Sequence, residues 1–238
     1  MAKERLDKLM ASTGRWSRRE AKILIKEGRV LVDGMPAASG DDKVDPAMSE
    51  ILVDGEDLGY QTFTYVMLHK PAGILTATED KRQQTVLDLL SPELRKQGLF
   101  PVGRLDKDTE GLLLMTNDGD LAHRLLAPKS HVDKVYYAEL DHPLCPADQT
   151  AFREGITLAD GTVCMPADLE LLGDGRQVLI TIREGKFHQI KRMTASRGSQ
   201  VQYLKRLSMG ALQLDENLEK GDYRYLTAEE VQNLGGKI

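Results

Sequence analysis

The sequence is poor in cysteine and has no clustered histidines. Only Cys145 and Cys164 are cysteines, and they form neither a Cys-x-x-Cys pair nor a zinc-ligand pattern, so we expect both to be reduced. The five histidines are scattered, and none has a His, Cys or carboxylate partner at a metal-site spacing. These shortages disfavour a metal enzyme, and we expect no cofactor.

Long apolar runs are also missing. None approaches the roughly 20 residues that a helix needs to cross a bilayer. The first ten residues, MAKERLDKLM, lack the apolar segment of a secretory signal peptide. With 41% hydrophobic and 29% charged residues, the chain has the composition of a soluble globular protein. We therefore expect a cytoplasmic monomer that does not act at a membrane.

Positive charge is concentrated near the N-terminus. The net charge of the chain is -5, yet residues 1–32 contain nine Lys or Arg against four Asp or Glu, which is net +5. Residues 33–238 then carry 23 basic and 33 acidic residues, net -10. A compact basic module on an acidic body suits attraction to a phosphate backbone. A salt-bridged helix on the protein surface explains the same charges equally well.

The basic segment has the pattern of a helical pair. Apolar residues fall on one face of a short helix around residues 6–10 and on one face of a second around residues 21–25. Ser17 and Glu20 have the spacing of a capping box, so the second helix is predicted to begin there and to end before Gly28.

A strand and a tight turn follow this pair. Residues 30–32 are strand-like, and Asp33 and Gly34 can supply the positive φ angles of a hairpin turn. The segment from residue 5 to residue 34 resembles an S4 domain, a small RNA-binding module. The resemblance implies that RNA is bound by the basic side chains on and beside the helices, namely Arg5, Arg15, Arg18, Arg19, Lys22, Lys26 and Arg29.

Two domains are predicted. We expect the S4-like RNA-binding domain over residues 1–55, a short polar linker over residues 56–61 and a larger domain over residues 62–238.

The larger domain is predicted to be α+β. Helical stretches are expected over residues 118–126 and from Thr227 onward, where another capping box begins. Strands that do not alternate strictly with helices favour a mixed or antiparallel sheet. The strand-like runs are residues 65–68, 112–115, 136–140 and 178–182.

One loop of the larger domain is a candidate for chemistry. Residues 103–112 are polar, bounded by glycines and followed by a strand that looks buried, which holds their carboxylates against the core. The residue types alone favour a turn aspartate at Asp106, with Arg104 as its partner. Asp106 and Asp108 lie two apart in a loop with no fixed separation, so a glycosidase pair is a weak interpretation.

The loop sequence GRLDKDTEGL resembles the signature of the RsuA-type and RluA-type pseudouridine synthases, with Asp106 at the position of the catalytic aspartate. With the S4-like module in front, the resemblance covers essentially the whole chain and favours the RsuA-like branch. Within that branch, enzymes of small-subunit (16S) ribosomal RNA are the most similar. The other matching motifs are at residues 69–73, 134–136, 185–193 and 204–206.

The resemblance implies roles for individual residues. Asp106 adds to the sugar or the base, or removes a sugar proton. Tyr136 stacks on the uracil and takes the C5 proton as general base. Lys191 pairs with Asp106, at a position where many relatives have arginine. The remaining expected substrate-binding residues are Arg104, Leu204, Arg192 and Arg206, although Leu204 taken alone fits an ordinary core position.

The sequence therefore predicts isomerisation of uridine to pseudouridine in ribosomal RNA, most closely 16S rRNA, either free or within a ribosomal particle. Because the reacting atoms lie inside the base stack, the target must be flipped out or already splayed. Two alternatives stay open. One is a 23S rRNA enzyme of the same family. The other is a non-catalytic S4-type ribosome-binding factor, which needs the basic module but not the site residues.

Overall fold

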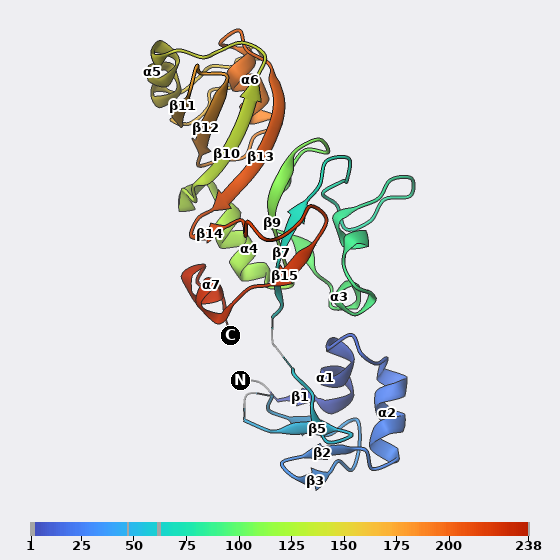
Figure 1. The fold of residues 1–238 in the computed structure, drawn as a ribbon. Coiled ribbons are helices and arrows are strands. Elements are labelled where there is room, and N and C mark those ends of the chain that lie inside the picture. Colours follow the sequence, from blue (N-terminus) through green and yellow to red (C-terminus); the bar gives the residue numbers. More distant parts are fainter. Residues whose placement is uncertain (1–2, 47, 61–62, 238) are drawn as a thin grey trace. The chain divides into compact units, whose positions relative to one another are not determined.

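The computed structural model describes residues 3–46, 48–60 and 63–237 and divides into two compact units (Figure 1). The first unit comprises Met1–Thr64 and Leu90–Leu99, and the second comprises Tyr65–Leu89 and Phe100–Ile238. Residues 61 and 62, where we expect the linker to end and the larger domain to begin, lie outside the described residues. No helix in the described ranges is long and apolar enough to cross a membrane.

The first unit is built on the predicted helical pair, α1 (Leu6–Ser12) and α2 (Arg18–Lys26). The capping box of α2 is confirmed, because the Ser17 hydroxyl accepts from the Glu20 N–H at 3.2 Å and the Glu20 carboxylate accepts from the Ser17 N–H at 2.6 Å. The helix ends as predicted, with Gly28 at φ +72°. The inner faces of both helices bury apolar side chains in one core cluster.

Short strands pack beneath these helices. The predicted turn is confirmed, since Asp33 and Gly34 have φ angles of 51° and 77°. Four strands form a sheet in the order β3-β2-β5-β6, and a separate pair joins β1 to β4. Their bounds are β1 (Glu4–Arg5), β2 (Val30–Val32), β3 (Met35–Pro36), β4 (Lys43–Val44), β5 (Ile51–Val53) and β6 (Glu56–Asp57).

The segment expected as a linker differs in part from that prediction. Asp54 and Gly55 have φ angles of 54° and 82°, so the chain turns back and β6 pairs with β5. Leu58 follows at 3% exposure within the core cluster of the first unit. Residues 56–58 therefore complete this unit, because a second tight turn returns them to its sheet.

The second unit is a nine-stranded mixed sheet, which confirms the predicted α+β class. Its main path is β11-β12-β10-β13-β9-β7-β15, and β14 and β8 pair with β13 and β9. The pairing of β13 with β9 is parallel, and the other neighbours are antiparallel. The bounds are β7 (Tyr65–Lys70), β8 (Phe100–Pro101), β9 (Glu110–Thr116), β10 (Lys134–Leu140), β11 (Asp168–Leu172), β12 (Gln177–Ile182), β13 (Val201–Met209), β14 (Leu212–Gln213) and β15 (Tyr223–Tyr225).

Helices border this sheet, with α5 and α6 at the end that carries β11, β12 and β10 (Figure 1). The predicted capping box at Thr227 is confirmed at the start of α7. On α4, Leu121 and Leu125 are buried, whereas Leu126 is 42% exposed. The helices are α3 (Pro92–Lys96, in the first unit), α4 (Gly119–Leu126), α5 (Pro146–Glu154), α6 (Gln189–Ala195), α7 (Ala228–Asn233) and the 3-10 turns η1 (Val86–Leu89) and η2 (Pro128–Ser130).

A glycine allows the parallel strands to meet. Gly111 has φ +104°, and a Cβ atom there would lie 2.2 Å from the Arg206 carbonyl oxygen and 2.6 Å from its nitrogen. No side chain fits at that distance. The glycine that follows the Asp106 loop is therefore required by the contact between β9 and β13.

Candidate active site

A pocket in the second unit brings together most of the residues predicted from the sequence. Asp106, Arg104, Tyr136, Lys191 and Leu204 all line it. They come from the loop before β9, from β10, from α6 and from β13, and of these only α6 and β13 follow one another in the chain. The pocket exists only because the sheet brings these distant segments together.

Backbone bonds hold the Asp106 loop in place. The Leu105 N–H donates to the Thr76 hydroxyl at 3.2 Å, and this hydroxyl donates to the Leu105 carbonyl at 2.7 Å. The Thr109 N–H donates to the Asp106 carbonyl at 3.1 Å. Leu105 itself is 5% exposed and anchors the loop in the core. The residues on both sides of Asp106 are thus fixed, and its carboxylate faces the pocket.

A fully buried lysine lies beneath the same loop. The Lys70 ammonium donates to the carbonyls of Pro71, Lys107 and Thr109 at 3.0, 3.2 and 2.9 Å. Two of these acceptors lie in the loop, just after Asp106. Burial lowers the pKa of Lys70 to about 8, while the charges of nearby carboxylates, first Asp108, oppose that shift. Lys70 is therefore a positioning residue for the loop.

The Asp106 carboxylate lies between two cationic or polar groups. The Lys191 ammonium is 3.3 Å from it, and the His188 Nε2 atom is 3.6 Å from its other oxygen. The same ammonium donates to Asp108 at 2.6 Å and holds the pKa of that carboxyl below its usual value. Lys191 is thus shared between two carboxylates instead of serving Asp106 alone, which the sequence did not predict.

Tyr136 and Leu204 form the apolar side of the pocket. Tyr136 pairs with Arg206 across the ladder between β10 and β13, and Ala138 pairs with Leu204, so these side chains share one face of the sheet. Tyr136 is 7% exposed and Leu204 5%. A flat ring and a branched aliphatic chain near a carboxylate suit a planar base held by stacking and van der Waals contact.

Two of the predicted substrate-binding residues lie away from the pocket lining. Arg206 is 1% exposed, and its Nε donates to the Leu112 carbonyl at 2.8 Å, so its guanidinium points into the interior. Arg192 forms an ion pair with Asp160 at 2.5 Å. It follows Lys191 on α6, and one residue of helix turns a side chain by about 100°. Neither side chain lines this pocket. Contact of either residue with the RNA stays a prediction.

Further residues line the pocket besides those expected to react with or bind the substrate. His188 lines it in a left-handed conformation with φ 48°. Thr109 lines it too, and its hydroxyl is buried with no hydrogen-bond partner among the described residues. The position of Lys70 near the site could have been inferred from the sequence, because Lys70 belongs to the motif at residues 69–73, which occurs together with the Asp106 loop. No cluster of His, Cys, Asp or Glu suited to a metal ion occurs among the residues described.

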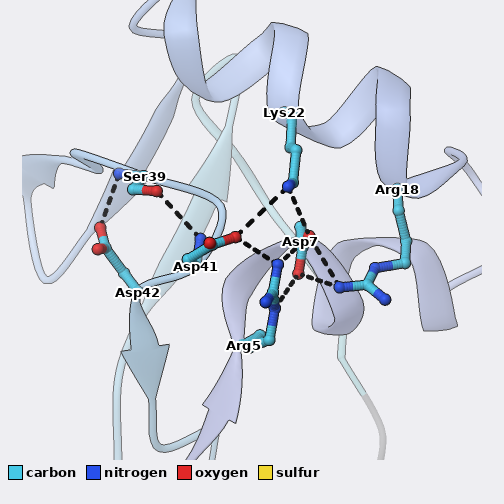
Figure 2. Close-up of polar contacts among 7 residues, drawn as sticks. All are labelled: Arg5, Asp7, Arg18, Lys22, Ser39, Asp41 and Asp42. Carbon is cyan, nitrogen blue, oxygen red and sulfur yellow. Dashed lines mark hydrogen bonds and ion pairs between the residues drawn. The ribbon is translucent and has the colours of Figure 1, made fainter.

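The basic residues of the first unit are organised by a buried carboxylate (Figure 2). Asp7 is fully buried, and it accepts from Arg5 at 2.9 and 3.0 Å and from Arg18 at 3.0 and 3.1 Å. Lys22 lies 3.7 Å from it and 3.4 Å from Asp41, which also pairs with Arg5. The Arg5 and Arg18 guanidiniums hold the pKa of the Asp7 carboxyl well below its usual range.

The other basic residues of the first unit differ in whether a carboxylate pairs with them. Arg29 makes two 2.7 Å bonds to Asp54, and Arg15 lies 3.6 Å from Glu56 and covers the Trp16 ring. No ion pair links Arg19 or Lys26 to another described residue. Both line a hollow on the surface of α2 that also includes Arg18, Lys22, Asp7 and Ile23. Within this hollow, Arg19 and Lys26 are the cations without a carboxylate partner among the described residues, whereas Arg18 and Lys22 are paired with Asp7.

Two family models match the chain in consecutive stretches. The model described as RNA pseudouridylate synthase matches residues 64–196, and the S4 domain model matches residues 4–51.

Individual relatives match over nearly the full length. The uncharacterized RNA pseudouridine synthase YtzG of Bacillus subtilis is 49% identical over 97% of this chain and 98% of its own length. The ribosomal small subunit pseudouridine synthase A of Vibrio cholerae is 41% identical over 97% of this chain and 99% of its own. A crystal structure of a pseudouridylate synthase has a TM-score of 0.69 and 37% identity, and it covers 97% of this chain and 99% of that one.

Proposed function

The chain belongs to the RNA pseudouridylate synthase family, and from this membership we propose that it converts a specific uridine of small-subunit ribosomal RNA to pseudouridine. The family resemblance predicted from the sequence is thereby confirmed, as are the S4 domain and the enzyme class. The substrate proposal is supported by relatives in Vibrio cholerae and Pseudomonas aeruginosa that are named for the small ribosomal subunit, at 41% and 40% identity.

The observation that carries the catalytic proposal is the shared pocket of Asp106, Tyr136, Lys191 and Leu204. Isomerisation breaks the bond between C1′ of the ribose and N1 of the uracil, and forms one between C1′ and C5. The atoms of the nucleoside are conserved, but the hydrogen on C5 is lost and N1 gains one. The residues must therefore supply a carboxylate, contacts that hold the free base, and a proton acceptor.

We assign the carboxylate role to Asp106, which adds to the sugar or the base, or removes a sugar proton. Lys191 holds it from one side, and the bonded loop fixes its backbone, so little reorganisation is needed when substrate arrives. Arg104 is exposed at the pocket. From that position it can hold the RNA backbone or help to displace the target nucleotide.

The contacts that hold the free base are assigned to Tyr136 and Leu204. Between them the detached uracil can turn without leaving, since stacking holds a ring while allowing rotation in its plane. The Tyr136 hydroxyl is then the acceptor for the C5 proton. Both side chains are deeply buried, so this side of the pocket is apolar and fixed in place.

The test of the proposed substrate is a map of pseudouridines in ribosomal RNA. In cells lacking this protein, we expect one pseudouridine to disappear from 16S rRNA and 23S rRNA to be unchanged. Restoring the wild-type gene should restore the modification, and restoring the Asp106→Asn gene should not. Loss from 23S rRNA would support the alternative target, and an unchanged map of both RNAs would contradict the proposal.

RNA binding by the first unit is assigned chiefly to Arg19 and Lys26. The double variant Arg19→Ala/Lys26→Ala should bind rRNA more weakly, and the slope of log K against log salt should fall by about 2, because two phosphate contacts are lost. The matched control is Arg29→Ala, whose guanidinium is already paired with Asp54. If the control lowers the slope as much as the double variant, the assignment to the α2 hollow fails.

The alternative of a non-catalytic ribosome-binding factor is disfavoured by the same pocket, because such a factor has no need of a carboxylate, a tyrosine and a lysine from three separate elements. We also propose that the chain acts as a monomer in the cytoplasm, on ribosomal RNA that is free or held in an assembly particle. Sedimentation of the purified protein with and without RNA tests whether the protein is a monomer.

A further inference from the structure

An exposed aromatic ring stands at the edge of the active-site pocket. Phe187 is 75% exposed, although its chain neighbours Lys186 and His188 both line the pocket. Its neighbour His188 approaches Asp106 to 3.6 Å. The ring is therefore carried by the stretch of chain that lines the pocket.

One face of this ring is already covered. The His188 imidazole stacks on it with ring centroids 3.8 Å apart and an interplanar angle of 18°. His188 has φ 48°, a left-handed conformation that is uncommon for a residue other than glycine and that turns its ring back onto its neighbour. With 75% of Phe187 still exposed, the second face of the ring is open to solvent.

The backbone that carries Phe187 is firmly held. The Gln189 side chain is 4% exposed, accepts from the Lys186 N–H at 3.0 Å and donates to Glu184 at 2.8 Å. Arg192 donates to the Phe187 carbonyl at 3.4 Å. The ring is thus presented on a braced loop, which lowers the entropy lost when it binds a partner.

We propose that Phe187, backed by His188, is a stacking platform for a nucleobase adjacent to the target uridine. The proposal rests on the proposed function, because a uridine that leaves the stack deprives its neighbours of stacking. Base stacking on an aromatic side chain recovers part of that loss and tolerates any base, since every base has a π face. The platform would therefore favour the flipped state without selecting the sequence.

Isolated exposed apolar side chains are common and need no function. Phe187 differs from an ordinary exposed residue in three respects: its inner face is covered by a parallel ring, its loop is braced and it adjoins the pocket. An uncharged ring is also unsuited to phosphate, so the partner it fits is a base and not the RNA backbone.

The first test compares four variants in single-turnover tritium release from C5-labelled 16S rRNA. Phe187→Ala should lower the rate about tenfold. Phe187→Leu should be nearly as slow, because it restores apolar volume but no aromatic face, whereas Phe187→Trp should be within about twofold of wild type. Tyr225→Ala is the matched control, since Tyr225 is 55% exposed in the same unit and does not line the pocket. Full rescue by leucine would overturn the proposal.

The second test detects the stack directly. Trp16 is the only tryptophan in the chain, so Trp16→Phe combined with Phe187→Trp places a single fluorophore at the proposed platform. Binding of 16S rRNA should quench the fluorescence of this double variant strongly, and Trp16→Phe alone provides the background. Undiminished fluorescence under conditions where RNA is bound would contradict the platform.

The two proposals can fail separately. If wild type releases no tritium from 16S rRNA but that RNA quenches the fluorescence of the double variant, the substrate assignment fails and the platform is supported. If wild type is active but the fluorescence is unchanged and Phe187→Ala keeps full rate, the platform fails and the function stands.

Discussion

Replacing Asp106 with asparagine is expected to abolish the release of tritium from C5-labelled uridine in ribosomal RNA, with a loss of at least about a thousandfold. The amide keeps the shape of the side chain but is neither a nucleophile nor a base. RNA binding should stay within about twofold of wild type, because phosphate contacts supply most of the affinity. The measurements are single-turnover tritium release and filter binding.

Asp108→Asn is the matched control for this variant. Asp108 lies in the same loop and also contacts Lys191, at 2.6 Å, but it is 73% exposed and does not line the pocket. We expect its rate to fall less than about tenfold, since an exposed ion pair contributes little. Equal losses in both variants would mean that the lysine pair, and not the identity of Asp106, is what matters.

Replacing Lys70 with methionine should both destabilise the protein and slow the reaction. Three carbonyls, that of Thr109 fully buried, lose their donor. We expect this to lower the free energy of unfolding by about 2–3 kcal/mol, a net value that includes the gain from no longer burying the ammonium charge. Because two of these carbonyls belong to the loop that carries Asp106, turnover should fall at least about tenfold at temperatures where the variant is fully folded. Chemical denaturation and tritium release measure the two effects.

Lys134→Met is the control for removing a buried lysine. Lys134 is 7% exposed, and its ammonium donates to one carbonyl, that of Val132, at 3.1 Å. Burial lowers its pKa as it does for Lys70. We expect a loss of stability below about 1 kcal/mol. A loss as large as that of Lys70→Met would show that burying any lysine here has the same effect and that the three-carbonyl contact has no special role.

The contribution of Lys70 to stability should also depend on pH. Burial lowers its pKa to about 8 from the ordinary 10.5, so between these values the unfolded chain binds more protons than the folded one. Stability from this group therefore rises with pH across that window and is lost as pH falls through 8. The difference in unfolding free energy between wild type and Lys70→Met should grow from pH 8 to 10.5. A shrinking difference would mean that the three carbonyls favour the ammonium more than burial disfavours it.

Local features of the fold were predictable because their signals are local. The capping boxes at Ser17 and Thr227 and the turn at Asp33 each depend on residues within about four positions of one another. The parallel pairing of β9 with β13 joins residues about 95 positions apart, and no short pattern encodes it. The second turn at Asp54 repeats the Asp-Gly signal of the first, so the strand after it was readable in principle.

Site residues were predictable to the extent that they fall within contiguous motifs. Those motifs placed Asp106, Tyr136 and Lys191 in one set, and the structure puts them in one pocket. They did not indicate side-chain direction, and Arg192 and Arg206, which belong to the same motifs, do not line the pocket. On a helix, the side chain of the next residue points about 100° away from that of the residue before it. On a strand, a side chain on the face that carries the site can still be buried beneath the site. The contacts between Lys70 and the Asp106 loop were not predictable, because the sequence does not show which carbonyls the lysine side chain reaches.

The sharing of Lys191 between two carboxylates has a consequence for charge balance through the reaction cycle. If Asp106 forms a bond to the substrate, its negative charge disappears, and a lysine that served it alone would become an uncompensated cation in a partly closed site. Asp108, 2.6 Å from the same ammonium, remains as a reserve counter-ion at that stage. The site then passes from one net negative charge to neutrality, and Lys191 keeps a carboxylate partner throughout.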